Sequence, residues 1–338
     1  MTTPAPGRRR MAVRSGALLV AAIAATATAL AHGAWAGSAT PAAAGSSVFS
    51  VAPYVDMSNG QEPVLDTAIT GHGLKAYTAA FVIGTGCNQE WGDTLPVGND
   101  SYTDPEIARA KSEGASVIIS SGGAAGEPLA WTCTNQSAIQ AGYQAIISDY
   151  GVKQLDFDVE GAAVADQTSA TRHFTAMKAL QAANPGLQFS MTLPVLPSGL
   201  TQDGVNILTS AKNVGVKINV VNIMTMDYYQ GSQDMGAAAV KAAQSTLAQM
   251  KSVDSSYTYA NLGITPMIGV NDTNTEVFTL SNASALVAWA KGQAFINRLA
   301  FWSLARDNGG CANQGFASPV CSGVAQSAWQ FSSLLTPF

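Results

Sequence analysis

The chain has 338 residues, of which 47% are hydrophobic and 12% are charged, and its formal net charge is −5. This length and composition suit one large globular domain, or two ordinary ones, with a sizeable core. The acidic balance argues against nucleic acid and anionic lipid as partners, because both attract basic surfaces.

The N-terminus has the pattern of a secretory signal peptide over residues 1–36. A basic start is followed by an apolar run over 17–31 and by small residues at 34–36, where cleavage is expected. The apolar run is shorter than the ~20 residues that cross a bilayer, so a membrane anchor is the weaker interpretation. We expect a secreted, extracellular protein with a flexible leader over 37–47 and a catalytic domain over 48–338. Removal of residues 1–36 takes away four arginines and no acid, which leaves 17 − 4 = 13 basic against 22 acidic residues, a net charge of −9.

Eight apolar runs follow at intervals along the chain, and we expect them to be strands. They are Val48–Met57, Ala76–Gly86, Ala115–Gly123, Gln154–Gly161, Leu187–Val195, Ile218–Tyr229, Ala260–Val270 and Arg298–Asp307. Segments with helical spacing lie between them, for example Asn135–Gly151 and Ala237–Ser252. Near-continuous apolar strands that alternate with helices predict a parallel sheet covered by helices, and eight such units fit a single-domain (β/α)8 TIM barrel. An open doubly wound sheet is the alternative, but no G-x-G-x-x-G follows the first strand.

Four cysteines follow the expected cleavage site, an even number that favours two disulfides in an exported protein. Three pairings are possible. We expect Cys87–Cys133 and Cys311–Cys321, the second of which closes a short loop. Structural zinc is less favoured, because no close cysteine pair has a histidine beside it. With only His72 and His173 after the cleavage site, we expect no metal and no cofactor, and we place His173 on a helix surface without a role.

The most informative segment is QLDFDVEG, which begins at Gln154 and puts Asp156, Asp158 and Glu160 at every second position. In a strand these carboxylates share one face. The pattern predicts that Asp156 and Asp158 raise the pKa of Glu160, the acid nearest the barrel mouth, so that it holds a proton near neutral pH. A calcium site is less favoured, because calcium prefers six to eight oxygens from a loop.

This segment resembles the signature D-x-x-D-x-D-x-E of glycoside hydrolase family 18 at its last three acids. Three more stretches resemble motifs of the family in the same order: Ser120–Gly123 is similar to S-x-G-G, Met224–Asp227 to M-x-Y-D, and Trp302 to the tryptophan of the eighth strand. The resemblance covers the chain after the leader, and the strings APYVDM and NIMTMDYY look like the compact secreted bacterial chitinases of that family.

The resemblance implies a retaining, substrate-assisted cleavage of bonds between N-acetylglucosamine units. Glu160 would protonate the glycosidic oxygen, and the acetamido oxygen of the substrate would be the nucleophile. Asp158 would hydrogen-bond the acetamido N–H with Asp156 behind it, Asp227 would hold the acetamido group, and Trp302 would form the floor under the sugar.

Two residues depart from the family pattern. Lys153 stands where the first acid is expected, at the start of the strand and far from the mouth. Met226 stands where the family often has tyrosine, so Tyr228 or Tyr229 must supply a phenol, and strand parity favours Tyr228. We also expect Tyr54 and Met224 to contact substrate.

We therefore expect a secreted chitinase, monomeric and acting within chains, that takes chitin or N-acetylglucosamine oligosaccharides. We expect no separate carbohydrate-binding module beside the barrel. The alternatives are an endo-β-N-acetylglucosaminidase that cuts N-glycans, which would share the mechanism, and an inactive chitinase-like lectin that binds chitin. The presence of Glu160 favours an enzyme over the lectin.

Overall fold

The computed structural model describes residues 47–58, 62–92 and 94–338 of the chain, and these residues belong to one compact unit. The expected signal peptide over 1–36 and all of the expected leader except Ser47 lie outside the described residues. None of the helices in the described part of the chain combines the length and the apolar character needed to cross a membrane.

Eight strands of the described residues form a parallel series, each hydrogen-bonded to the next in chain order. They are β1 (Tyr54–Asp56), β2 (Ala76–Thr85), β5 (Ser116–Gly122), β6 (Gln154–Asp158), β7 (Gln188–Leu196), β9 (Val220–Met224), β10 (Leu262–Thr265) and β13 (Arg298–Leu299). The first and last strands are linked by a parallel bridge between Val51 and Leu299, and the N–H of Tyr54 donates to the carbonyl of Phe301 at 3.0 Å. These contacts join the two edges of the series, and the predicted α/β fold with its parallel barrel strands is confirmed.

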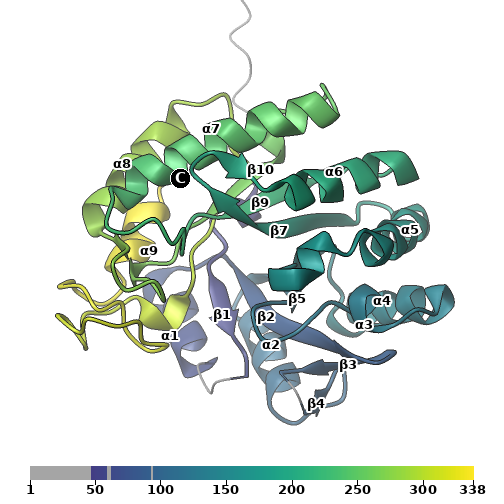
Figure 1. The fold of residues 1–338 in the computed structure, drawn as a ribbon. Coiled ribbons are helices and arrows are strands. Elements are labelled where there is room, and N and C mark those ends of the chain that lie inside the picture. The colour runs from purple at the N-terminus through teal and green to yellow at the C-terminus, as the bar shows by residue number, and fades with distance from the viewer. Residues whose placement is uncertain (1–46, 59–61, 93) are drawn as a thin grey trace, which may run out of the picture. The chain divides into compact units, whose positions relative to one another are not determined.

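Helices lie on the outside of these strands (Figure 1). The α-helices are α1 (Glu62–His72), α2 (Thr103–Ser112), α3 (Leu129–Thr132), α4 (Gln136–Tyr150), α5 (Gln167–Ala183), α6 (Gln202–Val214), α7 (Met235–Val253), α8 (Leu280–Lys291) and α9 (Gln330–Leu335). Short 3-10 helices are η1 (Val48–Ser50), η2 (Gly161–Ala165), η3 (Tyr259–Asn261) and η4 (Leu304–Arg306). Short antiparallel strands extend the sheet or pair beside it: β3 (Asn88–Trp91), β4 (Leu95–Pro96), β8 (Gly199–Leu200), β11 (Gly269–Val270) and β12 (Val277–Phe278).

Helix α4 shows how local sequence sets the element boundaries. Its N-cap Asn135 accepts hydrogen bonds from the N–H groups of Ser137 and Ala138, which satisfies donors that have no partner inside the helix. It ends at Gly151, which takes the left-handed conformation (φ 58°) that glycine adopts without steric cost. Between the caps, the residues at helical spacing that face the sheet are buried: Ile139, Tyr143, Ile146, Ile147 and Tyr150.

Four predicted strands are shorter than expected. Of the runs Ala260–Val270 and Arg298–Asp307, only Leu262–Thr265 (β10) and Arg298–Leu299 (β13) are barrel strand, and the other two runs differ as follows. The run Val48–Met57 begins with η1, because the side chain of Ser47 accepts a hydrogen bond from the N–H of Phe49 and starts a turn instead of a strand. The run Ile218–Tyr229 contains β9 only as far as Met224. The second difference changes which side chains reach the barrel mouth.

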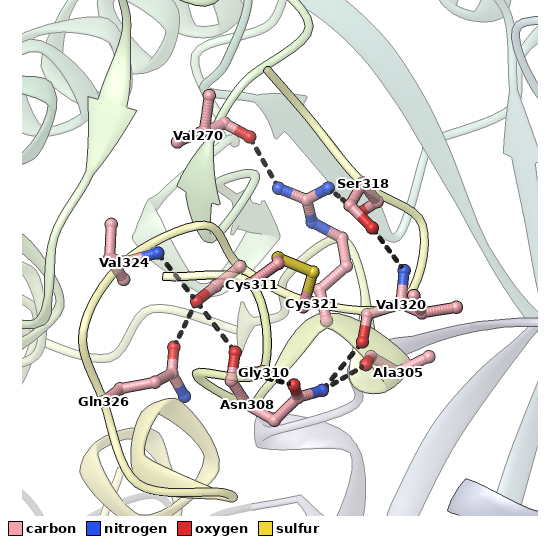
Figure 2. Close-up of a disulfide and its surroundings, with 12 residues drawn as sticks. Val270, Ala305, Asn308, Gly310, Cys311, Ser318, Val320, Cys321, Val324 and Gln326 are labelled. Atoms are coloured by element: carbon pink, nitrogen blue, oxygen red, sulfur yellow. Dashed lines mark hydrogen bonds between the residues drawn. A yellow bond between two sulfur atoms is a disulfide. The ribbon is translucent and has the colours of Figure 1, made fainter. Parts of the chain in front are cut away.

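Both expected disulfides are present in the structure. Cys87–Cys133 joins the turn between β2 and β3 to the end of α3, and Cys311–Cys321 closes a loop after β13. Figure 2 shows the second disulfide beside Asn308, whose side-chain amide donates to the carbonyls of Ala305 and Val320. This loop is therefore fixed by side-chain to backbone contacts as well as by its covalent bond.

The surface position expected for His173 is wrong. The residue lies on α5 but is fully buried against β6 and β7, where the rings of Phe157, Phe174 and Phe189 have centroids 4.3, 5.0 and 5.9 Å from its imidazole. Its Nδ1 lies 3.4 Å from the hydroxyl of Tyr143. Burial lowers the pKa of His173 from 6.5 to about 3.

Candidate active site

A cleft of about 760 Å³ opens at the carboxyl ends of the barrel strands. Its walls come from every one of the eight parallel strands or from the loop that follows it. The sequence-predicted residues in the wall are Tyr54, Asp158, Glu160, Met224, Asp227 and Trp302. The position agrees with the rule that sites of parallel barrels lie at this end.

Asp156 lies below the cleft and has no exposed surface. Four hydroxyls contact its carboxylate: Tyr54 OH and Ser120 Oγ at Oδ2 (2.9 and 2.7 Å), and Thr192 Oγ1 (2.8 Å) and Ser190 Oγ at Oδ1. The fully buried Arg298 donates in turn to Ser190 Oγ at 3.1 Å. These contacts fix the orientation of Asp156 and satisfy both of its oxygens, as a buried carboxylate requires.

Asp158 faces the cleft one alternation further along β6 and is 4% exposed. Its Oδ1 is buried and has no hydrogen-bond partner among the described residues. Burial, followed by the charges of Glu160 and Asp156, raises the pKa of Asp158 well above its ordinary value. Asp158 therefore lies in the cleft wall with one carboxyl oxygen that no described residue satisfies.

Glycine is required where β5 runs beside Asp158. Gly122 has φ 115°, and a Cβ on it would lie 1.9 Å from the carbonyl oxygen of Asp158. Together with Ser120, which contacts Asp156, this gives the Ser120–Gly123 stretch a structural role in bringing β5 close to β6.

Glu160 continues the alternation beyond the end of β6, because its backbone remains extended (φ −125°, ψ 171°). The three acids therefore share one face, as the sequence pattern predicts. The pKa of Glu160 is raised to about 7, first by burial and then by the charges of Asp227 and Asp272. The direction agrees with the prediction, and part of the cause lies outside the predicted strand, because Asp227 and Asp272 come from later loops of the cleft wall. A carboxyl group with this pKa can donate and accept a proton near neutral pH.

Three aromatic rings meet at the floor of the cleft. The rings of Phe81 and Trp302 are stacked with centroids 5.7 Å apart and planes at 16°, and Tyr54 lies 6.1 Å from both. Phe81 was not predicted from the sequence, because it lies in the middle of the apolar run of β2, where nothing marks it as a residue of the cleft. The stacked pair offers an apolar face on which a flat ring can lie.

The structure does not place Tyr228 in the cleft. Its side chain is 3% exposed and is absent from the cleft wall, whereas Met226, Asp227 and the 82% exposed Tyr229 are part of the wall. Asp227 (φ 47°) and Tyr229 (φ 58°) take left-handed conformations, so side chains beyond Met224 no longer alternate as they do in a strand. The parity argument that favoured Tyr228 fails for this reason.

Two further acids in the cleft wall were missed, Glu127 and Asp272. Asp272 lies two residues after the end of both β11 and the predicted strand run Ala260–Val270. A polar residue at the carboxyl end of a barrel strand is a signal that could have identified it. Lys153, the departure at the start of β6, is exposed, and it is absent from the cleft wall. Across the described ranges, no group of three or more His, Cys, Asp or Glu side chains could hold a metal ion.

Comparison with curated proteins finds two relatives, while no family model matches the chain. The chain is 34% identical over 310 residues to a protein of Escherichia coli K12 described as a probable bifunctional chitinase/lysozyme, with 85% of this chain and 34% of that protein covered. It is 34% identical over 273 residues to endochitinase 11 of Metarhizium anisopliae, with 76% and 52% covered. The chain thus spans about a third to a half of the length of these relatives.

Solved structures show the same similarity over a whole domain. The catalytic domain of a hyperthermophilic chitinase from Pyrococcus furiosus aligns with a TM-score of 0.76 and 32% identity, over 85% of this chain and 93% of that domain. Catalytic-site mutants of active domain 2 of a thermostable chitinase from that organism, solved in complex with chito-oligosaccharides, align with a TM-score of 0.75, 31% identity and the same coverage.

Proposed function

The chain belongs to glycoside hydrolase family 18, the family of these chitinases, and from that premise we propose that it hydrolyses β-1,4 bonds between N-acetylglucosamine units. The observation that carries the proposal is Glu160, a half-buried carboxyl group with a pKa of about 7 in the wall of the cleft. Its neighbour Asp158 shares the same face of the chain and has an oxygen without a partner among the described residues. Chito-oligosaccharides bound to the Pyrococcus domain support the choice of substrate.

In the proposed mechanism Glu160 transfers its proton to the glycosidic oxygen as the bond from that oxygen to the anomeric carbon breaks. The carbonyl oxygen of the substrate's own acetamido group attacks the anomeric carbon and forms an oxazolinium ion. Asp158 accepts a hydrogen bond from the acetamido N–H, which orients the acetamido carbonyl oxygen for its attack. Water then attacks the anomeric carbon and returns a proton to Glu160, so the product keeps the configuration of the substrate.

The rest of the wall would orient the sugar. The stacked rings of Phe81 and Trp302 suit the apolar face of a sugar ring. Asp227 lies across the cleft, where it can accept a hydrogen bond from the substrate. The hydroxyl contacts that fix Asp156 keep the base of the site rigid, which favours a preorganised arrangement of charge.

The test is hydrolysis of a chitin hexamer by the wild-type protein and by Glu160→Gln, with the anomeric form of fresh products followed by NMR. We expect β-anomeric products from the wild type and a loss of about 10²–10⁴ in kcat for the variant, the usual contribution of a general acid. The variant should still bind the hexamer. Binding without cleavage by the wild type would instead indicate a lectin, and release of glycans from a glycoprotein without cleavage of the hexamer would indicate an N-glycan endoglycosidase.

A further inference from the structure

The turn after β9 brings two side chains to the cleft in an unfavourable backbone conformation. Asp227 and Tyr229 both have positive φ, 47° and 58°, and both lie in the cleft wall. Residues with a side chain adopt this conformation only where the surrounding contacts hold them in it. The contacts that hold this turn therefore control where Asp227 and Tyr229 lie.

Glu276 supplies the main contacts to the turn. Its side chain has no exposed surface, its Oε2 accepts a hydrogen bond from the N–H of Tyr228 at 2.8 Å, and its Oε1 accepts one from the N–H of Gln230 at 3.1 Å. One carboxylate thus binds the two N–H groups on either side of Tyr229. Hydrogen bonds from N–H groups to a charged acceptor are about twice as strong as neutral ones.

Neighbours of Glu276 bind the same turn at Asp227. The N–H of Thr273 donates to Asp227 Oδ1 at 2.6 Å, and the N–H of Asp227 donates to Asn271 Oδ1 at 3.4 Å. The segment that carries these groups contains an internal hydrogen bond, in which the N–H of Asn271 donates to the carbonyl of Glu276 at 3.0 Å. The segment after β11 therefore acts as a template for the turn.

This template is tied to the barrel through the fully buried guanidinium of Arg306. Its Nη2 donates to the carbonyls of Ile268 and Val270 at 2.9 and 2.6 Å, and its Nη1 donates to the carbonyl of Ser318 in the loop closed by the disulfide. The position of Glu276 is thus set by contacts that do not involve the turn.

We propose that Glu276 is a positioning residue for the reaction, which holds Asp227 and Tyr229 in the wall of the cleft by binding the backbone of the turn that carries them. The proposal rests on the proposed chitinase function. Glu276 touches neither the cleft nor substrate, and it acts through the place of Asp227.

The test compares Glu276→Gln with a matched control, Asp307→Asn. Asp307 is also a buried carboxylate that accepts two backbone N–H groups, those of Phe331 and Ser332 at 2.9 and 2.7 Å, but it lies outside the cleft wall. In both variants the new amide N–H₂ group faces a backbone N–H that the carboxylate oxygen accepted before. Two donors then face each other, so both variants should lower Tm. We expect kcat on the chitin hexamer to fall about 10- to 100-fold for Glu276→Gln and to stay unchanged for Asp307→Asn. The reason is that a displacement of about 1 Å at a group that contacts the substrate can lower the rate by about this factor.

A double-mutant cycle with Asp227→Asn separates positioning from general damage. Because Glu276 acts through Asp227, Glu276→Gln should lower kcat by less than about twofold in the Asp227→Asn background. An effect of equal size in both backgrounds, or an equal loss of kcat in Asp307→Asn, would overturn the proposal.

Hydrogen exchange gives a readout that does not depend on the enzymatic activity. In Glu276→Gln the amides of a peptide covering residues 226–231 should exchange faster than in the wild type, whereas in Asp307→Asn they should not. Unchanged exchange in this peptide would refute the role of Glu276 even if activity fell. If the wild type cleaves no chitin, the proposed function fails and the exchange result alone decides whether Glu276 holds the turn.

Discussion

Replacement of His173 by methionine should make the protein less sensitive to acid. The imidazole is fully buried among aromatic rings, and its pKa is about 3 in the folded protein against 6.5 for the free side chain. Below about pH 6.5, His173 therefore binds a proton in the unfolded chain, whereas in the folded protein it does so only below about pH 3. The contribution of His173 to the free energy of unfolding is fully present above pH 6.5. It is lost as the pH falls toward 3, because protonation then favours the unfolded state.

The size of the effect follows from the two pKa values. The full difference of 3.5 units corresponds to about 5 kcal/mol, since one unit is worth about 1.4 kcal/mol. Between pH 7 and pH 4.5 the loss should be roughly 2–3 kcal/mol. His173→Met has no group that titrates in this range, and its flexible thioether suits a pocket lined by aromatic rings.

Urea unfolding at pH 7, 5.5 and 4.5, with the disulfides intact, measures the effect for the wild type, His173→Met and a control, Phe174→Leu. Phe174 is buried on the same helix, so its substitution disturbs the core without removing a titrating group. Between pH 7 and 4.5, the free energy of unfolding of the wild type and of Phe174→Leu should fall by roughly 2–3 kcal/mol more than that of His173→Met. The raised pKa values of Asp158 and Glu160 act in the opposite direction but are common to all three proteins. Parallel pH dependences of the wild type and His173→Met would refute the reasoning.

Two further predictions concern the catalytic acid and the disulfides. The value of kcat/KM should fall above about pH 7, as Glu160 loses its proton. Asp272→Asn should move this fall to lower pH, because the charge of Asp272 helps to raise the pKa of Glu160. A fall that stays at the same pH or moves to higher pH would contradict this. Replacement of both cysteines of a disulfide by alanine should lower the free energy of unfolding by about 4 kcal/mol for Cys87–Cys133 and by about 3 kcal/mol for Cys311–Cys321, because the bonds close loops of 46 and 10 residues. Urea unfolding measures both losses. A larger loss for the shorter loop would show that chain entropy does not set the order.

Much of the fold could be predicted from the sequence, because barrel strands are apolar runs and their spacing is regular. Each of the eight expected runs overlaps one parallel strand, and β7 extends one residue beyond its run. The alternation of Asp156, Asp158 and Glu160 is a property of extended backbone, and it places three acids on one face without knowledge of the rest of the chain. Patterns that depend only on the local backbone conformation can therefore be predicted from the sequence.

The parts that failed depend on contacts between distant segments. The choice of Tyr228 assumed that β9 continues, but the turn at Asp227 is held by Glu276, which lies 48 residues further along the chain than Tyr228. His173 follows a helical pattern that does not distinguish a polar surface position from a polar residue buried beside β6. The pKa of Glu160 depends on Asp272, whose distance from Glu160 is set by the closure of the barrel.

The hydroxyl network around Asp156 also bears on how the barrel assembles. Its members come from different strands: Tyr54 from β1, Ser120 from β5, and Ser190 and Thr192 from β7. A slip of β7 by one residue would turn both of its hydroxyls to the outer face, because side chains alternate along a strand. A buried charge that loses its partners costs about 3–5 kcal/mol. The acid at the base of the site therefore selects one strand register over its neighbours, and the same contacts that orient Asp156 discriminate against a misaligned β7.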